Sequence, residues 1–249
     1  MRLTTPLTPF EQFEINPLFS LNTSISFTNS SLFTLIVVSI LTFFFYLATH
    51  KLSVVPNAWQ GALEMVYEFV SSLVYGQIGV KGYKYLPLIF TTFTFILGCN
   101  MLGMIPYTFT VTSHLIITLG LAMSIFIGVN IIAGNQHGWH FFSFFLPQGV
   151  SLMLAPFLVL IEVISYLFRV VSLAVRLFAN MMSGHALLKI LAGFSWTMSS
   201  KGGLIFIASI IPLAIVFILT GLELAIAFLQ AYVFSVLVCI YLNDAIHLH

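Results

Sequence analysis

Two long apolar runs near the C-terminus decide the fold of this chain. The first is VSLMLAPFLVLIEVISYLFRVVSLAVRLFANMMSGHALLKILAGF (Val150–Phe194), and the second is LIFIASIIPLAIVFILTGLELAIAFLQAYVFSVLVCIYLNDA (Leu204–Ala245). As a single α-helix each would measure about 60 Å, roughly twice the thickness of a membrane's hydrocarbon core. Each run could instead be two short spans joined by a tight turn, but turn signals inside the runs are weak. The sequence therefore favours a hairpin of two long, strongly tilted helices within residues 147–249.

The composition of the whole chain indicates a membrane protein. Hydrophobic residues make up 60% of the 249 residues and charged residues only 6%, whereas a soluble domain carries about 25% charged residues. The net charge is +1 and no block of basic residues is present, which argues against nucleic-acid binding. Cys99 and Cys239 both lie inside apolar runs, so neither a disulfide framework nor a thiolate metal site is expected. We predict an all-α integral membrane protein.

Three shorter apolar segments upstream have the length of conventional membrane spans. They lie at residues 32–51 and, as a hairpin with one short connection, within residues 86–133. Between the first and second spans, residues 57–76 repeat apolar side chains every three or four positions, with Gln60 and Glu64 on the opposite face. This pattern favours an amphipathic helix in the membrane interface, with a helix on the soluble side as the alternative.

The lysines predict the orientation of the chain in the membrane. Lys51, Lys81 and Lys84 all fall between the first and second spans, whereas the loop after the second span has no Lys or Arg. By the positive-inside rule the first loop lies on the inner face. The N-terminal segment, residues 1–31, is then outside, and the amphipathic helix and the C-terminus are inside. Whether Met1–Leu7 is a removed leader is left open.

Polar side chains inside the two long runs form stripes. Such residues are costly in lipid and are functional candidates by default. Because residues seven apart share a helix face, two facing stripes would form a buried polar seam. The charged and amide residues concerned recur at multiples of seven positions: Glu162, Arg169 and Arg176 in the first run, and Glu223, Gln230 and Asp244 in the second.

Hairpin geometry predicts which groups of the seam lie at one level. With the turn between residues 194 and 203, Arg176 faces a position between residues 212 and 230, where Glu223 and Gln230 are the polar candidates. The spacing alone does not decide on which side of Arg176 the Glu223 carboxylate lies.

The same geometry places titratable groups on both sides of Arg176. Glu162 and Asp244 are farthest from the turn and belong toward the inner face, while His185 lies toward the outer face. Arginine stays protonated and cannot relay a proton, whereas a carboxylate or imidazole can when its pKa approaches neutrality. A proton could therefore enter by one cluster and leave by the other without crossing Arg176. The alternative is that the two arginines are simply buried ion pairs with Glu162 and Glu223.

Several stretches match one known family. Together they cover nearly the whole chain and resemble the ATP synthase subunit a family, with both chain ends closest to mitochondrial, particularly fungal, members. The most specific match is SLAVRLFAN followed by SGH. The stretches are PFEQFEI (Pro9–Ile15), GQIG (Gly76–Gly79), MIPY (Met104–Tyr107), HGW (His137–Trp139), SLAVRLFAN (Ser172–Asn180), SGH (Ser183–His185), PLA (Pro212–Ala214) and YLNDAIHLH (Tyr241–His249).

The resemblance implies a role for each residue of the seam. Arg176 matches the essential arginine that faces the carboxylate of a rotating ring of small hairpin subunits. Glu162 and Asp244 match the inner, matrix half-channel, and Arg169 matches a second arginine near it. The last two helices are expected to lie strongly tilted along the ring. The outer, intermembrane-space half-channel is implied to contain Asn180, His185, Glu223 and Gln230.

The resemblance also implies the surroundings of the protein. It would be a multi-pass protein of the mitochondrial inner membrane, not itself an enzyme, without a cofactor or bound metal. Its partners would be the ring of small proteolipid subunits, peripheral-stalk and other small membrane subunits, and lipids, with dimerisation of the complex left open. His137 and His140 have a spacing that could bind metal, but no third ligand of suitable type is nearby, so a loop or interfacial pair is favoured.

Two rival functions fit parts of the pattern. A secondary ion transporter would also carry intramembrane Arg and Glu, but it should show two related halves, and no internal repeat is visible. A structural subunit of a respiratory complex would explain the hydrophobic spans but not two stripes of ionisable residues.

Overall fold

The chain folds into helices with one small N-terminal β-hairpin. A computed structural model describes residues 10–20, 26–50, 53–105, 108–138, 155–202 and 204–246. The long helices confirm the predicted all-α membrane fold, while the two strands were not predicted. The helices are α1 (Asn29–Thr49), α2 (Ala58–Ile78), α3 (Leu86–Gly103), α4 (Leu115–His137), α5 (Ala155–Ser199), α6 (Leu204–Ala208) and α7 (Ile210–Ile246); the antiparallel strands are β1 (Pro17–Ser20) and β2 (Ser26–Thr28); short 3₁₀ turns cover Glu11–Phe13, Val80–Tyr85 and Val111–Ser113.

Five helical segments in the described part of the chain are long and apolar enough to cross a membrane. They correspond to α1, α3 with its preceding turn, α4, α5 and most of α6–α7. The amphipathic α2 is not among them, in keeping with its Gln and Glu side chains. The interfacial position of α2 and the tilt of α5 and α7 in a membrane remain predictions.

The helix ends follow local chemistry. The predicted hairpin ended at residue 133, but α4 continues to His137 and ends at Gly138, whose positive φ of 55° is one that glycine adopts readily. α5 runs for 45 residues, with its one proline, Pro156, at the start, where no helical hydrogen bond is lost.

The second long run was expected to form one long helix, but the structure divides it into two. It is interrupted at Ser209, between α6 and α7. Pro212 has no N–H to donate to the carbonyl of Ala208, and its ring crowds that carbonyl, so the helix breaks there. Ser195 of α5 donates its hydroxyl hydrogen to the carbonyl of Ser209 at 3.2 Å, which joins the two arms beside their turn.

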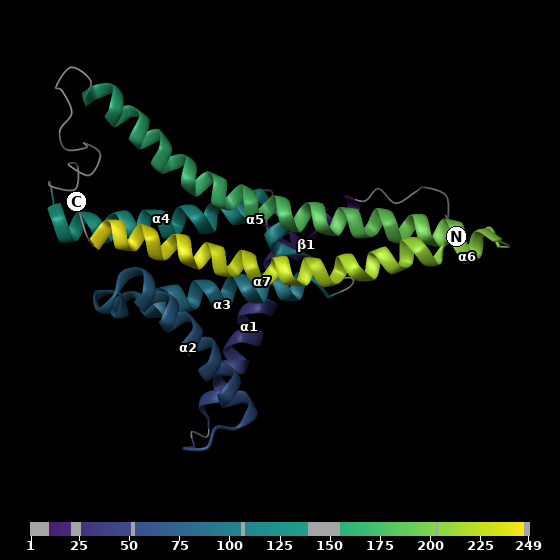
Figure 1. The fold of residues 1–249 in the computed structure, drawn as a ribbon, viewed down its shortest axis with the longest axis horizontal. Coiled ribbons are helices and arrows are strands. Elements are labelled where there is room, and N and C mark those ends of the chain that lie inside the picture. Colours follow the sequence, from purple (N-terminus) through teal and green to yellow (C-terminus); the bar gives the residue numbers. More distant parts are fainter. Residues whose placement is uncertain are drawn as a thin grey trace.

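The hairpin of α5 and α7 lies along the other spans. Figure 1 shows α7 between α5 on one side and α3 on the other, with α4 behind; α2 also contacts α7, while α1 packs on α2 and α3. The first turns of α5 diverge from the C-terminal end of α7 (Figure 1). The core forms where α2, α3, α4, α5 and α7 meet, and its largest buried side chains include Phe93, Val129, Leu177 and Phe234.

Candidate functional site

The centre of the site is a buried histidine–carboxylate pair between α5 and α7. His185 Nδ1 lies 3.6 Å from Glu223 Oε1, and the two side chains are 16% and 5% exposed. Both carboxylate oxygens of Glu223 and the Nε2 atom of His185 are buried without a hydrogen-bond partner among the described residues. Buried polar atoms in this state normally find water. The pair is therefore suited to exchange a proton with a small number of waters.

Gly184 makes room for this carboxylate. A Cβ atom at this position would lie 2.5 Å from Glu223 Oε1 and 2.9 Å from its carboxyl carbon. Only glycine lets α5 approach Glu223 so closely without displacing it. Sequence analysis gave Gly184 no role of its own, because its use depends on the side chain opposite; a glycine inside a helix was the signal available.

A second polar contact joins the same two helices. Asn180 Nδ2 donates to Gln230 Oε1 at 3.2 Å. Gln230 is 4% exposed, and its Nε2 atom is buried without a partner in the part of the chain that the structure describes. Since Gln230 follows Glu223 by seven residues, both side chains lie on one face of α7. The structure thus brings together Asn180, His185, Glu223 and Gln230, as the sequence analysis grouped them.

Arg176 lies one turn before Asn180 on α5, but it does not join this pair of contacts. Its side chain is exposed, and within the described residues it has neither an ion pair nor a hydrogen bond. Arg169 is exposed too. The buried ion pairs considered as an alternative, with Glu162 and Glu223 as partners, are not formed. A guanidinium on the surface of a membrane helix is costly unless a partner group meets it.

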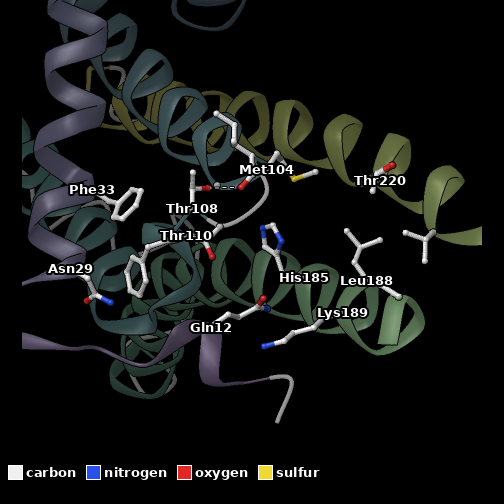
Figure 2. A pocket seen from close by; sticks show the side chains of 15 residues that line it. Gln12, Asn29, Phe33, Met104, Thr108, Thr110, His185, Leu188, Lys189 and Thr220 are labelled. Atoms are coloured by element: carbon white, nitrogen blue, oxygen red, sulfur yellow. Dashed lines mark hydrogen bonds between the residues drawn. The ribbon is translucent and has the colours of Figure 1, made fainter. Parts of the chain in front are cut away.

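Two cavities border the histidine–carboxylate pair. The larger has a volume of about 740 Å³ and is lined by His185 and Lys189 of α5, by Thr220 of α7, and by residues of the N-terminal segment and of the loop after α3, including Gln12 and Thr110 (Figure 2). The smaller, of about 190 Å³, is lined by Glu223, Asn180 and Gly184 among others. His185 thus borders the larger cavity and Glu223 the smaller one.

Aromatic and polar side chains gather where α4, α5 and α7 meet. The Tyr166 hydroxyl donates to Asn130 Oδ1 at 3.2 Å, and the rings of Tyr166 and Tyr241 are 6.3 Å apart. Asp244, Arg169 and Arg176 all act electrostatically on Tyr241. This end of the seam therefore holds a tyrosine pair that sequence analysis missed, because tyrosine in an apolar helix gives no distinct signal.

Glu162 and Asp244, the acidic groups that the hairpin geometry placed farthest from the turn, lie in α5 and α7. Both are half-buried, but no hydrogen bond or ion pair joins them in the described part of the chain. The first turns of α5 diverge from the end of α7 (Figure 1).

The histidines outside the seam show no metal site. His137 Nε2 lies 3.0 Å from the carbonyl oxygen of Ala245, so it holds the end of α7. His140 lies outside the described residues. Within the described ranges, no group of three His, Cys, Asp or Glu side chains could hold a metal ion.

Comparison with known proteins gives one consistent family. The family model described as ATP synthase A chain matches residues 31–243. The chain is 57% identical to ATP synthase subunit a of Marchantia polymorpha, over 98% of this chain and 99% of that protein. It is 57% identical to the protein of the same name from Oenothera berteroana, over 97% and 89% of the two chains. For the Chondrus crispus protein the identity is 54%, over 97% and 96%.

These three relatives come from plants and algae, so the likeness of the chain ends to fungal members remains a prediction. The family itself does not depend on that likeness. A match over residues 31–243 and an identity above half over nearly the full length leave one conclusion. The chain belongs to the ATP synthase subunit a family.

Proposed function

We propose that this chain is the proton-translocating, non-rotating membrane subunit of an ATP synthase, with two offset half-channels separated by Arg176. The observation that carries the proposal is a series of polar contacts that ends beside the exposed Arg176. It starts at the cavity bordered by His185, continues through the buried Glu223, and ends at the Asn180–Gln230 contact, one turn from Arg176.

The outer half-channel begins in the larger cavity. A volume of about 740 Å³ holds many waters, and its lining includes Lys189, Thr110 and Thr220 together with His185. From there a proton passes to the His185–Glu223 pair, whose unpaired buried atoms accept and donate through water. The smaller cavity beside Glu223 then leads toward Asn180.

Arg176 separates this path from the inner side. Its guanidinium keeps its charge and cannot pass a proton on. It faces away from the bundle, where a carboxylate carried by a rotating ring of small hairpin subunits would neutralise it. A ring carboxylate that is protonated from Glu223 is neutral and tolerable to lipid, so it can travel around the circle. Each proton that crosses contributes about 2.3 kcal/mol per 100 mV to rotation.

The inner half-channel accepts the proton after nearly a full turn of the ring. Asp244 lies beside the Tyr166–Tyr241 pair, and Glu162 lies near the start of α5. These carboxylates, with Arg169 nearby, would take up the proton and release it to the matrix. Because the two carboxylates are not in contact with each other, they would act in succession along a water-filled path.

Membership of the family supports a proposal for the surroundings of the chain. We place the chain in the mitochondrial inner membrane, with its N-terminus in the intermembrane space and its C-terminus on the matrix side. Its partners would be the proteolipid ring, peripheral-stalk and other small membrane subunits, and lipids. In this proposal it binds no nucleotide, and ATP is made by other subunits of the complex.

The test is substitution of Arg176 in the assembled complex. Arg176→Gln should abolish ATP-driven proton pumping, measured with a pH-sensitive dye in inverted membrane vesicles. Lys201→Gln removes a positive charge from the exposed turn between α5 and α6 and should leave pumping intact. Retained pumping in the Arg176→Gln complex would sink the proposal.

A further inference from the structure

A buried asparagine of α3 donates a hydrogen bond to the backbone of α7. Asn100, in the last turn of α3, is 0% exposed, and its Nδ2 atom donates to the carbonyl oxygen of Ala227 at 3.1 Å. α7 is helical through Ala227, so this carbonyl already accepts the helical bond from the N–H four residues on. The asparagine therefore adds a second hydrogen bond to the Ala227 carbonyl, which is already satisfied within the helix.

The contact falls between the two polar residues of α7 that face the path. Glu223, Ala227 and Gln230 are spaced by four and three residues and share one face of the helix. All three are buried, at 4%, 0% and 4% exposure. A restraint at Ala227 fixes the height and the rotation of α7 at the place where a small rotation would move both Glu223 and Gln230.

Packing alone does not account for an amide here. Asn100 Oδ1 is buried without a hydrogen-bond partner among the described residues, which is unfavourable in an apolar interior. A leucine of similar size would fill the same space without that cost. The orientation of the amide is fixed as well, because the flipped form would place its oxygen against the Ala227 carbonyl.

We propose that Asn100 is a positioning residue of the outer half-channel, which holds α7 through Ala227 so that Glu223 and Gln230 meet His185 and Asn180. The inference rests on the proposed function. In this role Asn100 acts on His185 and Glu223 only indirectly, through the backbone of α7 at Ala227.

The test uses the whole ATP synthase in its membrane, with the variants Asn100→Leu and Asn100→Thr. Leucine removes the hydrogen bond, and threonine keeps a polar group that bonds to its own helix and does not reach Ala227. The matched control is Thr94→Val on the same helix. Thr94 is also buried, but its hydroxyl bonds only to carbonyls of α3, those of Phe90 and Thr91.

Two measurements separate positioning from packing. The first is passive proton conduction of membranes freed of the catalytic sector, recorded against pH. Both Asn100 variants should lower conduction on the order of three- to tenfold and move the pH at which it is half-maximal, while Thr94→Val leaves both unchanged. The second repeats Asn100→Leu in a Gln230→Leu background, where its effect should shrink because the group it positions is gone.

An unchanged pH profile together with additive effects overturns the inference, even if conduction falls, since a packing defect has that signature. Should Asn100→Leu fail to assemble, Asn100→Thr decides by the same two measurements. Pumping by the Arg176→Gln complex would overturn the proposed function whatever Asn100 does. Loss of pumping in Arg176→Gln with additive Asn100 effects overturns this inference alone.

Discussion

His185 Nδ1 and Glu223 Oε1 lie 3.6 Å apart across the interface of α5 and α7, in a region where every neighbouring helix is apolar. Burying this pair does not stabilise the fold, because the carboxylate oxygens have no hydrogen-bond partner among the described residues. His185 borders a large cavity and Glu223 a small one. In the proposed function, this pair is the step at which protons leave water and enter the protein.

Loss of the carboxylate at this step should stop proton flow. Glu223→Gln keeps the shape of the side chain but cannot take up and release a proton at physiological pH. We expect passive proton conduction to fall by about a hundredfold or more, the usual size of a lost proton-transfer group. Glu223→Asp, which keeps the acid, should retain part of the conduction. Equal conduction by the Gln variant and the wild type would exclude Glu223 from the path.

Gly184 should be intolerant of even one added carbon. In Gly184→Ala the new Cβ would lie 2.5 Å from Glu223 Oε1, so the carboxylate must move. A displacement of this kind is expected to lower conduction about tenfold or more. Gly193→Ala in the same helix is the matched control, since no atom lies within 4 Å of its Cβ and alanine favours the helix. Similar conduction in the two alanine variants would mean that the close approach at Gly184 has no functional use.

The Asn180–Gln230 hydrogen bond should appear as a coupling between two positions. Asn180→Leu and Gln230→Leu each remove one partner and leave the other buried without its bond. In a double-mutant cycle on proton conduction, the two effects should fail to add by about 0.5 to 1.5 kcal/mol. Additive effects would show that the two amides act independently of each other.

The spans could be predicted from the sequence because hydrophobicity and length are local properties. The five spans, the amphipathic α2 and the long C-terminal hairpin follow from them. Helix spacing also named Glu223 and Gln230 as the polar candidates opposite Arg176, which stays a prediction. Polar residues in apolar runs stand out, which is why Glu223 and His185 could be named.

What could not be predicted depends on contacts between helices. The divergence of the first turns of α5 from the end of α7 depends on how the helices pack (Figure 1). Gly184 and Asn100 have meaning only through the atoms opposite them. A single sequence shows which residues share a helix face, but not which groups of another helix meet that face.

A pH effect is expected at the N-terminal end of α4. His114 precedes this helix and stacks on Phe109 with ring centroids 5.1 Å apart, and burial lowers the pKa of its imidazole below the usual 6.5. The folded turn then holds the neutral form, so its contribution to stability is present above pH 6.5 and is lost as the pH falls through the lowered pKa. The protection of residues 109–113 against hydrogen exchange, taken relative to the intrinsic exchange rate at each pH, should fall between pH 7 and pH 5. His114→Gln, which does not titrate, should remove that pH dependence.

The exposed guanidinium of Arg176 carries the central claim, that the two half-channels are kept apart by a charge that does not move. The most direct measurement compares two rates in Arg176→Ala membranes: ATP-driven proton pumping, and passive proton permeability after removal of the catalytic sector. The account predicts that pumping falls to background while passive permeability persists or rises, because the barrier between the two paths is gone. Pumping at the wild-type rate, or membranes that become impermeable to protons, would contradict it.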